Sequence, residues 1–363
     1  SIVTPQSFRS GIAGTGYRVN VKTTHIDWLN IVLMFLAASA AYVLPFEVFL
    51  FSYAVLGPLH YLTEISWLHE RRYFTTGARD ATVLFLLGVA LFFVNFGIPQ
   101  LMPPPEKASP AVLAQYSITL QQAGATVIYL AFMAALAMVA FRTLGSKILM
   151  MLLAGVFLMG MIKLPIWLLF FSVFLPTLVH VFLFTAAFML LGALRSRSLP
   201  GLLSFVLLFA IAGVLLFYRP DVYTVISPEI KNHYRYFVDL NGWLASLFGE
   251  RWNRAEVNQL AYQTPLGVAL MRFIAFAYTY HYLNWFSKTS IIKWHRVNWL
   301  RLSAIICLWL VAVGLYWWNY QYGFIALYTL SFLHVFLEFP LNWRSFIDLG
   351  KEIQNIYRNG WAR

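Results

Sequence analysis

Seven ionisable residues interrupt the apolar segments of this sequence, and they are the residues that could do chemistry. They are four histidines, two glutamates and one arginine: His60, Glu64, His180, Arg272, His281, His334 and Glu338. Ionisable side chains are costly inside a lipid bilayer, so a membrane segment that carries them usually has a functional use for them. Imidazole nitrogens and carboxylate oxygens together suit iron, zinc or manganese. We therefore predict a transition-metal site, with iron as the first expectation and haem or zinc as the alternatives.

Two of the histidines are followed by a glutamate four positions later. The pairs are His60 with Glu64 and His334 with Glu338. Residues four apart lie on one face of a helix, so each pair can offer a nitrogen and an oxygen to one point. We predict all four histidines as metal ligands. The two glutamates are the predicted catalytic groups, acting as ligands, as carboxylates that orient a ligand histidine, or as proton carriers.

Two more polar residues lie in the segment that carries His281. Arg272 precedes this histidine by nine positions, and Asn284 follows it by three. Arg272 could neutralise a substrate head group or bond a backbone carbonyl, and Asn284 takes the place that a glutamate has in the other two segments. We predict both as substrate-binding residues. The remaining histidines fall in loops or at segment edges and receive no role; they are His25, His69, His233 and His295.

The elements that position these residues must be membrane helices. Of the 363 residues, 60% are apolar and 11% are charged, whereas soluble chains average about 45–50% apolar and about 25% charged residues. Ten apolar runs approach the length that crosses a bilayer. They cover residues 28–44, 47–68, 81–98, 117–141, 147–162, 166–194, 199–218, 264–286, 299–318 and 322–340. The predicted fold is all-α, a polytopic bundle of about ten transmembrane helices. The division between the fifth and sixth runs is the weakest, which leaves nine spans as the alternative.

The distribution of Lys and Arg predicts how the bundle is oriented. Alternate loops and the two termini hold 18 of these residues, and the other set of loops holds seven. Cytoplasmic loops carry the excess of Lys and Arg, so both termini are expected in the cytoplasm. The predicted organisation is a cytoplasmic segment 1–27, a bundle 28–340 and a cytoplasmic basic tail 341–363. The loop 219–263 then lies on the outer side, as a covering loop or, alternatively, as an amphipathic helix along the interface. No cleavable signal peptide is expected.

All four histidines fall on spans that run in the same direction, toward the cytoplasm. Three of them precede the charged edge of their span by seven to ten positions, which places them about 10–15 Å inside the boundary at 1.5 Å per residue. His180 precedes Arg195 by 15 positions and is expected deeper. We expect the imidazoles to converge near the cytoplasmic leaflet. The plain alternative is that each histidine is a hydrogen-bonded packing residue.

Several classes of function are disfavoured by the sequence. A single cysteine, Cys307, excludes a disulfide framework, and the basic residues are spread between apolar runs rather than gathered for nucleic acid. Histidine boxes of the HxxxH type, a nucleotide-binding loop and a Gly-Xaa-Ser-Xaa-Gly motif are all absent from the sequence.

Three hypotheses from different classes remain. The first is an integral membrane oxidoreductase with a metal or haem site near the cytoplasmic leaflet, acting on a lipid-soluble substrate. The second is a non-catalytic or pigment- or haem-binding subunit of a larger membrane complex, with partner subunits or further copies of itself. The third is a proton-coupled transporter, in which the same His and Glu side chains form a relay. For all three we expect contact with membrane lipids and residence in a bacterial inner (plasma) membrane.

Overall fold

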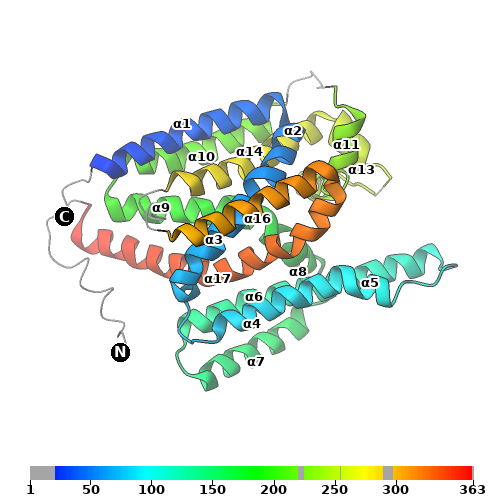
Figure 1. Cartoon of the computed structure of the whole chain (residues 1–363), viewed down its shortest axis with the longest axis horizontal. Coiled ribbons are helices and arrows are strands. Elements are labelled where there is room, and N and C mark those ends of the chain that lie inside the picture. Colours follow the sequence, from blue (N-terminus) through cyan, green and yellow to red (C-terminus); the bar gives the residue numbers. More distant parts are fainter. Residues whose placement is uncertain (1–20, 220–224, 254, 289–296, 362–363) are drawn as a thin grey trace.

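The computed structural model describes residues 21–219, 225–253, 255–288 and 297–361 (Figure 1). Helices make up 85% of the structure, and none of the described residues forms a strand. Within the described ranges, nine helices are long and apolar enough to cross a membrane. The number rises to ten if the helix pair Val257–Gln263 and Pro265–Ser287, bent by 79°, counts as one span. The predicted all-α fold, with about ten helices that could span a membrane, is therefore confirmed. Residues 1–20 of the predicted amino-terminal segment and His295 lie outside the described residues.

The described helices correspond to the ten predicted apolar runs. Seven runs form single helices: α1 (Val21–Val43), α6 (Pro110–Ala140), α7 (Leu144–Met161), α10 (Leu199–Phe217), α14 (Pro265–Ser287), α16 (Trp299–Trp318) and α17 (Tyr320–Asn359). Three runs contain a π-helical part between two α-helical parts. The first run consists of α2 (Pro45–Phe51), η2 (Ser52–Leu56) and α3 (Gly57–Glu70), and the second of α4 (Asp80–Phe92), η4 (Phe93–Gly97) and α5 (Ile98–Leu101). The third consists of α8 (Pro165–Leu169), η5 (Phe170–Phe184) and α9 (Thr185–Ser196).

Proline explains where the π-helical parts occur. A proline cannot donate a backbone hydrogen bond, and its ring clashes with the carbonyl four residues earlier. For Pro58 that carbonyl belongs to Ala54 in η2, and for Pro99 it belongs to Asn95 in η4. Pro176 lies inside η5 itself. Wider turns of this kind are often found at functional sites, and here η2 leads into the helix that carries one histidine while η5 contains another.

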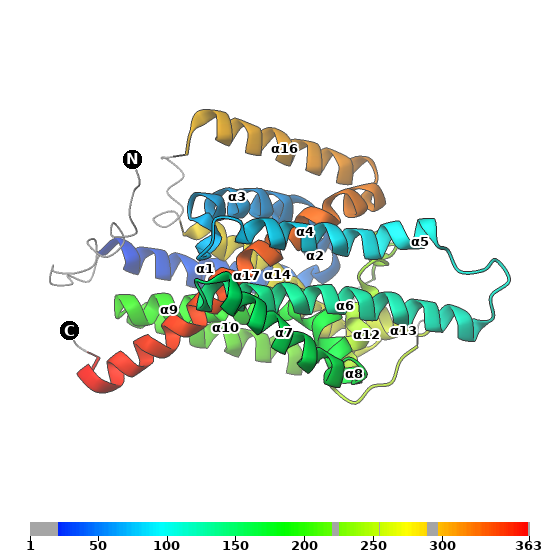
Figure 2. The same cartoon turned by 90° about the horizontal axis from the view of Figure 1, so that it is seen from below.

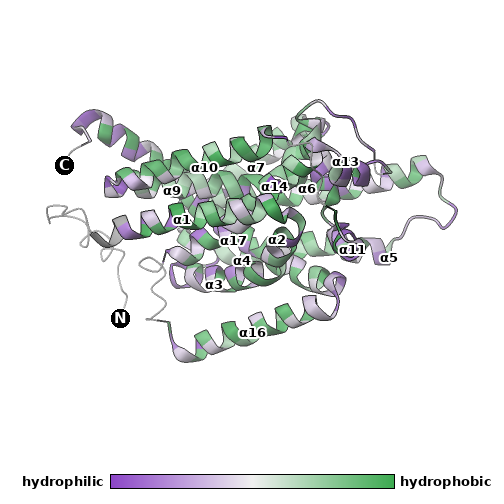
Figure 3. Cartoon of the chain, turned by 90° about the horizontal axis from the view of Figure 1, so that it is seen from above, coloured by the Kyte–Doolittle hydropathy of each residue, from purple (hydrophilic) through white to green (hydrophobic). Residues whose placement is uncertain are grey.

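The central helix of the bundle is α14, which is buried along almost its whole length. It lies between the α1–α10 layer and the α2–α3 segment (Figure 1). In contrast, α7 lies at the lower margin of the bundle in Figure 1 and α16 at the upper margin in Figure 2, and both expose most of their large apolar side chains. Figure 3 shows apolar residues along the middle of the bundle and hydrophilic ones toward its two ends. This distribution fits helices that face lipid at mid-height and water at both ends.

The first described helix begins, and the last helix ends, at the same end of the bundle (Figures 1 and 2). We call this end the N-side, and it is the end predicted to face the cytoplasm. The helix α17 does not stop at Pro340, where the bundle was predicted to end, but continues to Asn359. The ion pairs Arg195–Asp348 and Arg197–Glu352 tie this extension to the end of α9.

The predicted outer loop 219–263 folds into three short helices at the opposite end. They are α11 (Pro228–Tyr234), α12 (Val238–Ser246) and α13 (Val257–Gln263). Each buries apolar side chains, and together they pack on α2 and α14. The loop therefore covers the end of the bundle, and the described part contains no single long interfacial helix.

Candidate metal centre

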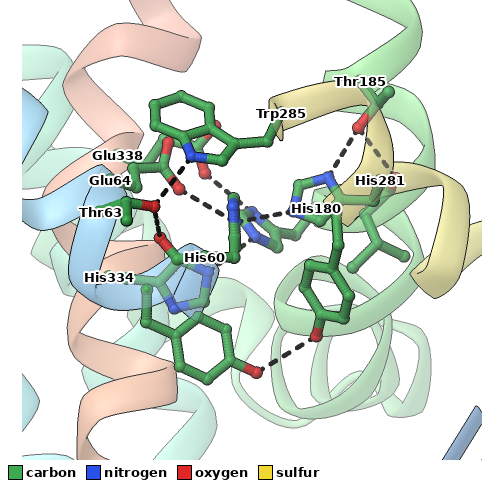
Figure 4. Close-up of polar contacts among 12 residues, drawn as sticks. His60, Thr63, Glu64, His180, Thr185, His281, Trp285, His334 and Glu338 are labelled. Carbon is green, nitrogen blue, oxygen red and sulfur yellow. Dashed lines mark hydrogen bonds and ion pairs between the residues drawn. The ribbon is translucent and has the colours of Figure 1, made fainter. Parts of the chain in front are cut away.

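The four histidines meet in one buried cluster inside the bundle (Figure 4). His60 comes from α3, His180 from η5, His281 from α14 and His334 from α17. Each is at most 8% exposed. We call these four residues the histidine cluster. The four helices run toward the N-side (Figure 1), as the sequence predicted.

The nitrogens of the cluster are spaced as ligands of one metal ion would be. His60, His180 and His334 each offer a ring nitrogen that lies within 4.8 Å of the other two. The Nε2 atoms of His281 and His60 are 3.0 Å apart, and those of His180 and His334 are 3.2 Å apart. Two ligands bound at about 2.1 Å from one ion lie about 3.0–3.4 Å from each other when the angle between them is about 90–109°. The spacing between facing nitrogens therefore fits an ion held between them.

The two glutamates occupy different places relative to the cluster. Glu64 places its Oε2 atom 3.1 Å from Nε2 of His60, which is the nitrogen that faces His281. Glu338 places its Oε2 atom 3.2 Å from Nδ1 of His180, on the outer edge of that ring. Glu64 is thus positioned as a further ligand, whereas Glu338 is positioned to orient a ligand histidine from behind. The sequence spacing paired Glu338 with His334, but its partner in the structure comes from the neighbouring helix.

Thr185 fixes the proton position of His281, and the sequence analysis missed it. Its hydroxyl donates to the carbonyl of Val181 at 3.0 Å and lies 2.8 Å from Nδ1 of His281. With the hydroxyl proton on that carbonyl, the Thr185 oxygen is free to accept the Nδ1–H of His281. The other ring nitrogen, Nε2, then carries a free lone pair that faces the cluster, as a metal ligand requires.

Several buried polar atoms of the site lack a hydrogen-bond partner among the described residues. They include Oε2 of both glutamates and Nδ1 of three cluster histidines: Glu64, Glu338, His60, His180 and His334. Almost all buried polar groups in folded proteins have a partner, so such a concentration calls for an explanation. A cation among the histidines would balance the two carboxylates, which supports the fit of a metal ion to this set.

Aromatic side chains hold the rings of the cluster in place. Tyr61 stacks on His334 with 4.2 Å between the ring centroids and 22° between the planes, and its hydroxyl lies 3.2 Å from that of Tyr282. Trp285 donates its indole N–H to Thr63 at 3.0 Å. Such packing removes rotamer freedom from the cluster and keeps the nitrogens close together without a large entropic cost on binding.

The prediction that His180 lies deeper than the other histidines is wrong. Its ring meets His334 directly. The error lies in the use of Arg195 to mark the membrane edge. Arg195 forms an ion pair with Asp348. Asp348 follows His334 by 14 positions and Arg195 follows His180 by 15, so the two paired residues lie about equally far from the histidines of their own helices. Both helices extend beyond the bundle, so a count from that arginine overestimates the depth.

The two predicted substrate-binding residues are placed differently. Asn284 lines a cavity beside the cluster and hydrogen-bonds Asn30 at 2.9 Å. Arg272 is buried away from the cluster, where its Nε donates to the carbonyl of Tyr42 at 3.0 Å and its guanidinium lies over the ring of the same residue. Arg272 lines neither cavity that touches the cluster. Substrate binding by these two residues stays a prediction.

Two cavities touch the histidine cluster from opposite sides. The outer cavity, of about 410 Å³, is rich in tyrosine and phenylalanine and reaches His180, His281 and His334. The N-side chamber, of about 330 Å³, reaches His60, His281 and both glutamates. The cluster therefore forms a partition between a largely aromatic cavity and a second cavity that ends in carboxylates.

Comparisons with known proteins do not add to this geometry. No protein-family model matches the chain, and no curated protein or solved structure matches it either. The function must therefore be argued from the residues of the site and their surroundings.

Proposed function

We propose that the protein is an integral membrane, metal-dependent oxidoreductase that acts on a lipid-soluble substrate. The observation that carries the proposal is the convergence of three buried imidazoles, those of His60, His180 and His334, on distances that suit one metal ion, with Nε2 of a fourth, His281, 3.0 Å from that of His60. All four ligands come from one chain, which supports a complete enzyme over a subunit that shares its cofactor with a neighbour. A bacterial inner membrane, with the N-side in the cytoplasm, is part of the proposal, and the charge distribution supports the orientation.

The donor set favours iron over the alternatives. Four imidazole nitrogens and one oxygen of Glu64 exceed the four ligands that zinc usually takes in proteins. Nitrogen and carboxylate donors that leave a coordination position open are typical of non-haem iron. Haem fits poorly, because Nε2 atoms 3.0–3.2 Å apart leave no room for a macrocycle between the rings. An iron ion would supply redox chemistry, while the chain binds and orients the substrate.

The outer cavity is the proposed substrate site. Its volume lies within the range of about 300–1,000 Å³ that ligand pockets usually have. Its aromatic walls lie within the membrane-spanning part of the bundle and include Tyr53, Tyr278 and Phe324. The lining also includes polar residues, among them Gln121 and Asp239. The aromatic walls favour a substrate that is largely apolar, and such a substrate dissolves in lipid. Tyrosine hydroxyls in the wall can bond the few polar groups that such a molecule carries.

A proton-coupled transporter is the second candidate function. It is favoured by the two cavities, which meet ionisable residues from opposite sides as the two pathways of a transporter do. A transporter of this kind needs no transition metal, so metal content separates the two candidates.

The test is elemental and optical analysis of the purified protein after anaerobic loading with Fe²⁺. We expect about one iron per chain and an absorption change when the iron is oxidised and reduced. His60→Ala and His334→Ala should each lose most of the metal. His69→Ala is the matched control, because this histidine lies on α3 as well but is exposed. Less than a tenth of an equivalent of any transition metal in the loaded wild-type protein would refute the proposal.

A further inference from the structure

The N-side chamber connects the N-side of the bundle with the two buried glutamates. At its mouth lie Arg195, which is exposed near the end of α9, and Lys288, which follows the end of α14. At its inner end lie Glu64 and Glu338, each 2% exposed. The wall between the two ends is mostly apolar and includes Leu341 of α17. The lining of the chamber thus combines two basic residues, the two buried glutamates and mostly apolar side chains.

Both glutamates line the N-side chamber, so water can reach them from it. Oε2 of Glu64 lies near one nitrogen of His60, and Oε2 of Glu338 lies near one nitrogen of His180, but neither oxygen forms a hydrogen bond with any other described residue. Neither glutamate lines the outer cavity. A buried carboxylate oxygen without a partner is strongly unfavourable. A volume of about 330 Å³ is many times the roughly 10–15 Å³ that one buried water needs. Water in the chamber would give both oxygens hydrogen-bond partners beyond the single imidazole nitrogen that each one contacts.

We propose that the N-side chamber is hydrated and forms the route by which water and small water-soluble molecules reach Glu64 and Glu338 from the N-side. The cluster then receives its two kinds of reactant separately, with the lipid-soluble one on the aromatic side and the water-soluble one on the carboxylate side. This division of reactants rests on the proposed function. The hydration of the chamber does not, because it follows from the buried carboxylates and the cavity alone.

Cysteine accessibility tests the proposal, and the chain suits it because Cys307 is the only native cysteine. In a Cys307→Ala background, Leu341→Cys places a thiol in the chamber wall, one turn from Glu338. Leu203→Cys is the control, because this residue lies four positions inside the N-side end of α10 and faces outward. Thiols react with methanethiosulfonate reagents as thiolates, which form in water and not in lipid. The protein is held in lipid nanodiscs and treated with a charged, membrane-impermeant reagent of this class.

We expect the cysteine at position 341 to react at least tenfold faster than the one at position 203. Adding Gly192→Phe should slow the reaction at position 341 at least tenfold, because Gly192 lines the chamber and a side chain there meets no neighbouring atom within 4 Å. Gly213→Phe, at an equally open site on α10 that does not line the chamber, should leave the rate unchanged.

Equal rates at positions 341 and 203, or a rate at 341 that Gly192→Phe leaves unchanged, would overturn the proposal. The measurement needs no bound metal, so it is separate from the test of the proposed function. A protein without metal can still have a hydrated chamber, and a protein with metal can have a dry one.

Discussion

Replacing Thr185 with valine should weaken metal binding without altering any ligand. Valine keeps the shape of threonine but removes the oxygen that accepts the Nδ1–H of His281. The buried N–H then has no partner, which costs about 1–3 kcal/mol. The imidazole can avoid this cost by moving its proton to Nε2, but that proton blocks the lone pair that faces the cluster. Either outcome disfavours the metal-bound state.

The expected magnitude follows from groups that play the same role elsewhere. Loss of a partner that orients a ligand histidine typically reduces metal affinity 10–100-fold, which corresponds to about 1.4–2.7 kcal/mol. This range agrees with the cost of one unpaired buried donor. Thr185→Ser retains the hydroxyl and should bind metal within about threefold of the wild type.

The assay is competition for Fe²⁺ against a chromophoric chelator, with the protein in detergent. Thr126→Val is the matched control, because Thr126 makes the same bond to the carbonyl four residues earlier but lies on α6, away from the cluster. Wild-type affinity in Thr185→Val, or equal losses in Thr185→Ser and Thr185→Val, would refute the assignment of the His281 proton.

Three further predictions concern other parts of the site. Glu64→Gln should change the optical or paramagnetic spectrum of the bound metal, whereas Glu338→Gln should lower the affinity and leave the spectrum nearly unchanged; the reverse pattern would exchange their roles. Burial lowers the pKa of Lys288 to about 8, against attraction from Glu338, Glu64 and Asp27. Its labelling by an amine reagent should therefore rise with pH and level off above about pH 8, as mass spectrometry would show, whereas an ordinary lysine levels off only above about pH 10. Arg272→Met should leave iron content unchanged by elemental analysis, because the residue lies about 13 Å along α14 from His281 at 1.5 Å per residue.

The membrane fold and the identity of the cluster histidines could be read from the sequence because both depend on local signals. An apolar run about 20 residues long forms a span whatever its neighbours are. A histidine within such a run is conspicuous because few residues of its kind occur there. Counting residues from charged edges also placed His60, His281 and His334 at similar depths, and the structure brings them into one cluster.

The pairings within the site could not be read from the sequence because they join different helices. The spacing of Glu338 and His334 is correct for one helix face, yet the carboxylate turns to His180 of the next helix. Thr185 gave no signal, since a threonine in an apolar helix commonly bonds the carbonyl four residues earlier. Its role depends on His281, 96 positions away in the chain. The π-helical turns of η5, which contain His180, also have no simple sequence signature apart from Pro176.

The charges of the site separate a metal centre from a set of packing histidines. Hydrogen bonds between imidazoles need no carboxylates, yet the structure buries Glu64 and Glu338 beside the rings, each 2% exposed. Two ionised carboxylates in a buried site are unfavourable unless a positive charge balances them. Arg195 and Lys288 also line the chamber, and Lys288 is near enough to attract both glutamates. Neither cation forms an ion pair with these glutamates within the described part of the chain. A divalent ion among the histidines would match the two negative charges, and neutral imidazoles would bind it without adding charge. The same charge balance explains why both carboxylates lie on the side of the cluster that faces the N-side chamber. Neither carboxylate lies on the side that faces the outer cavity.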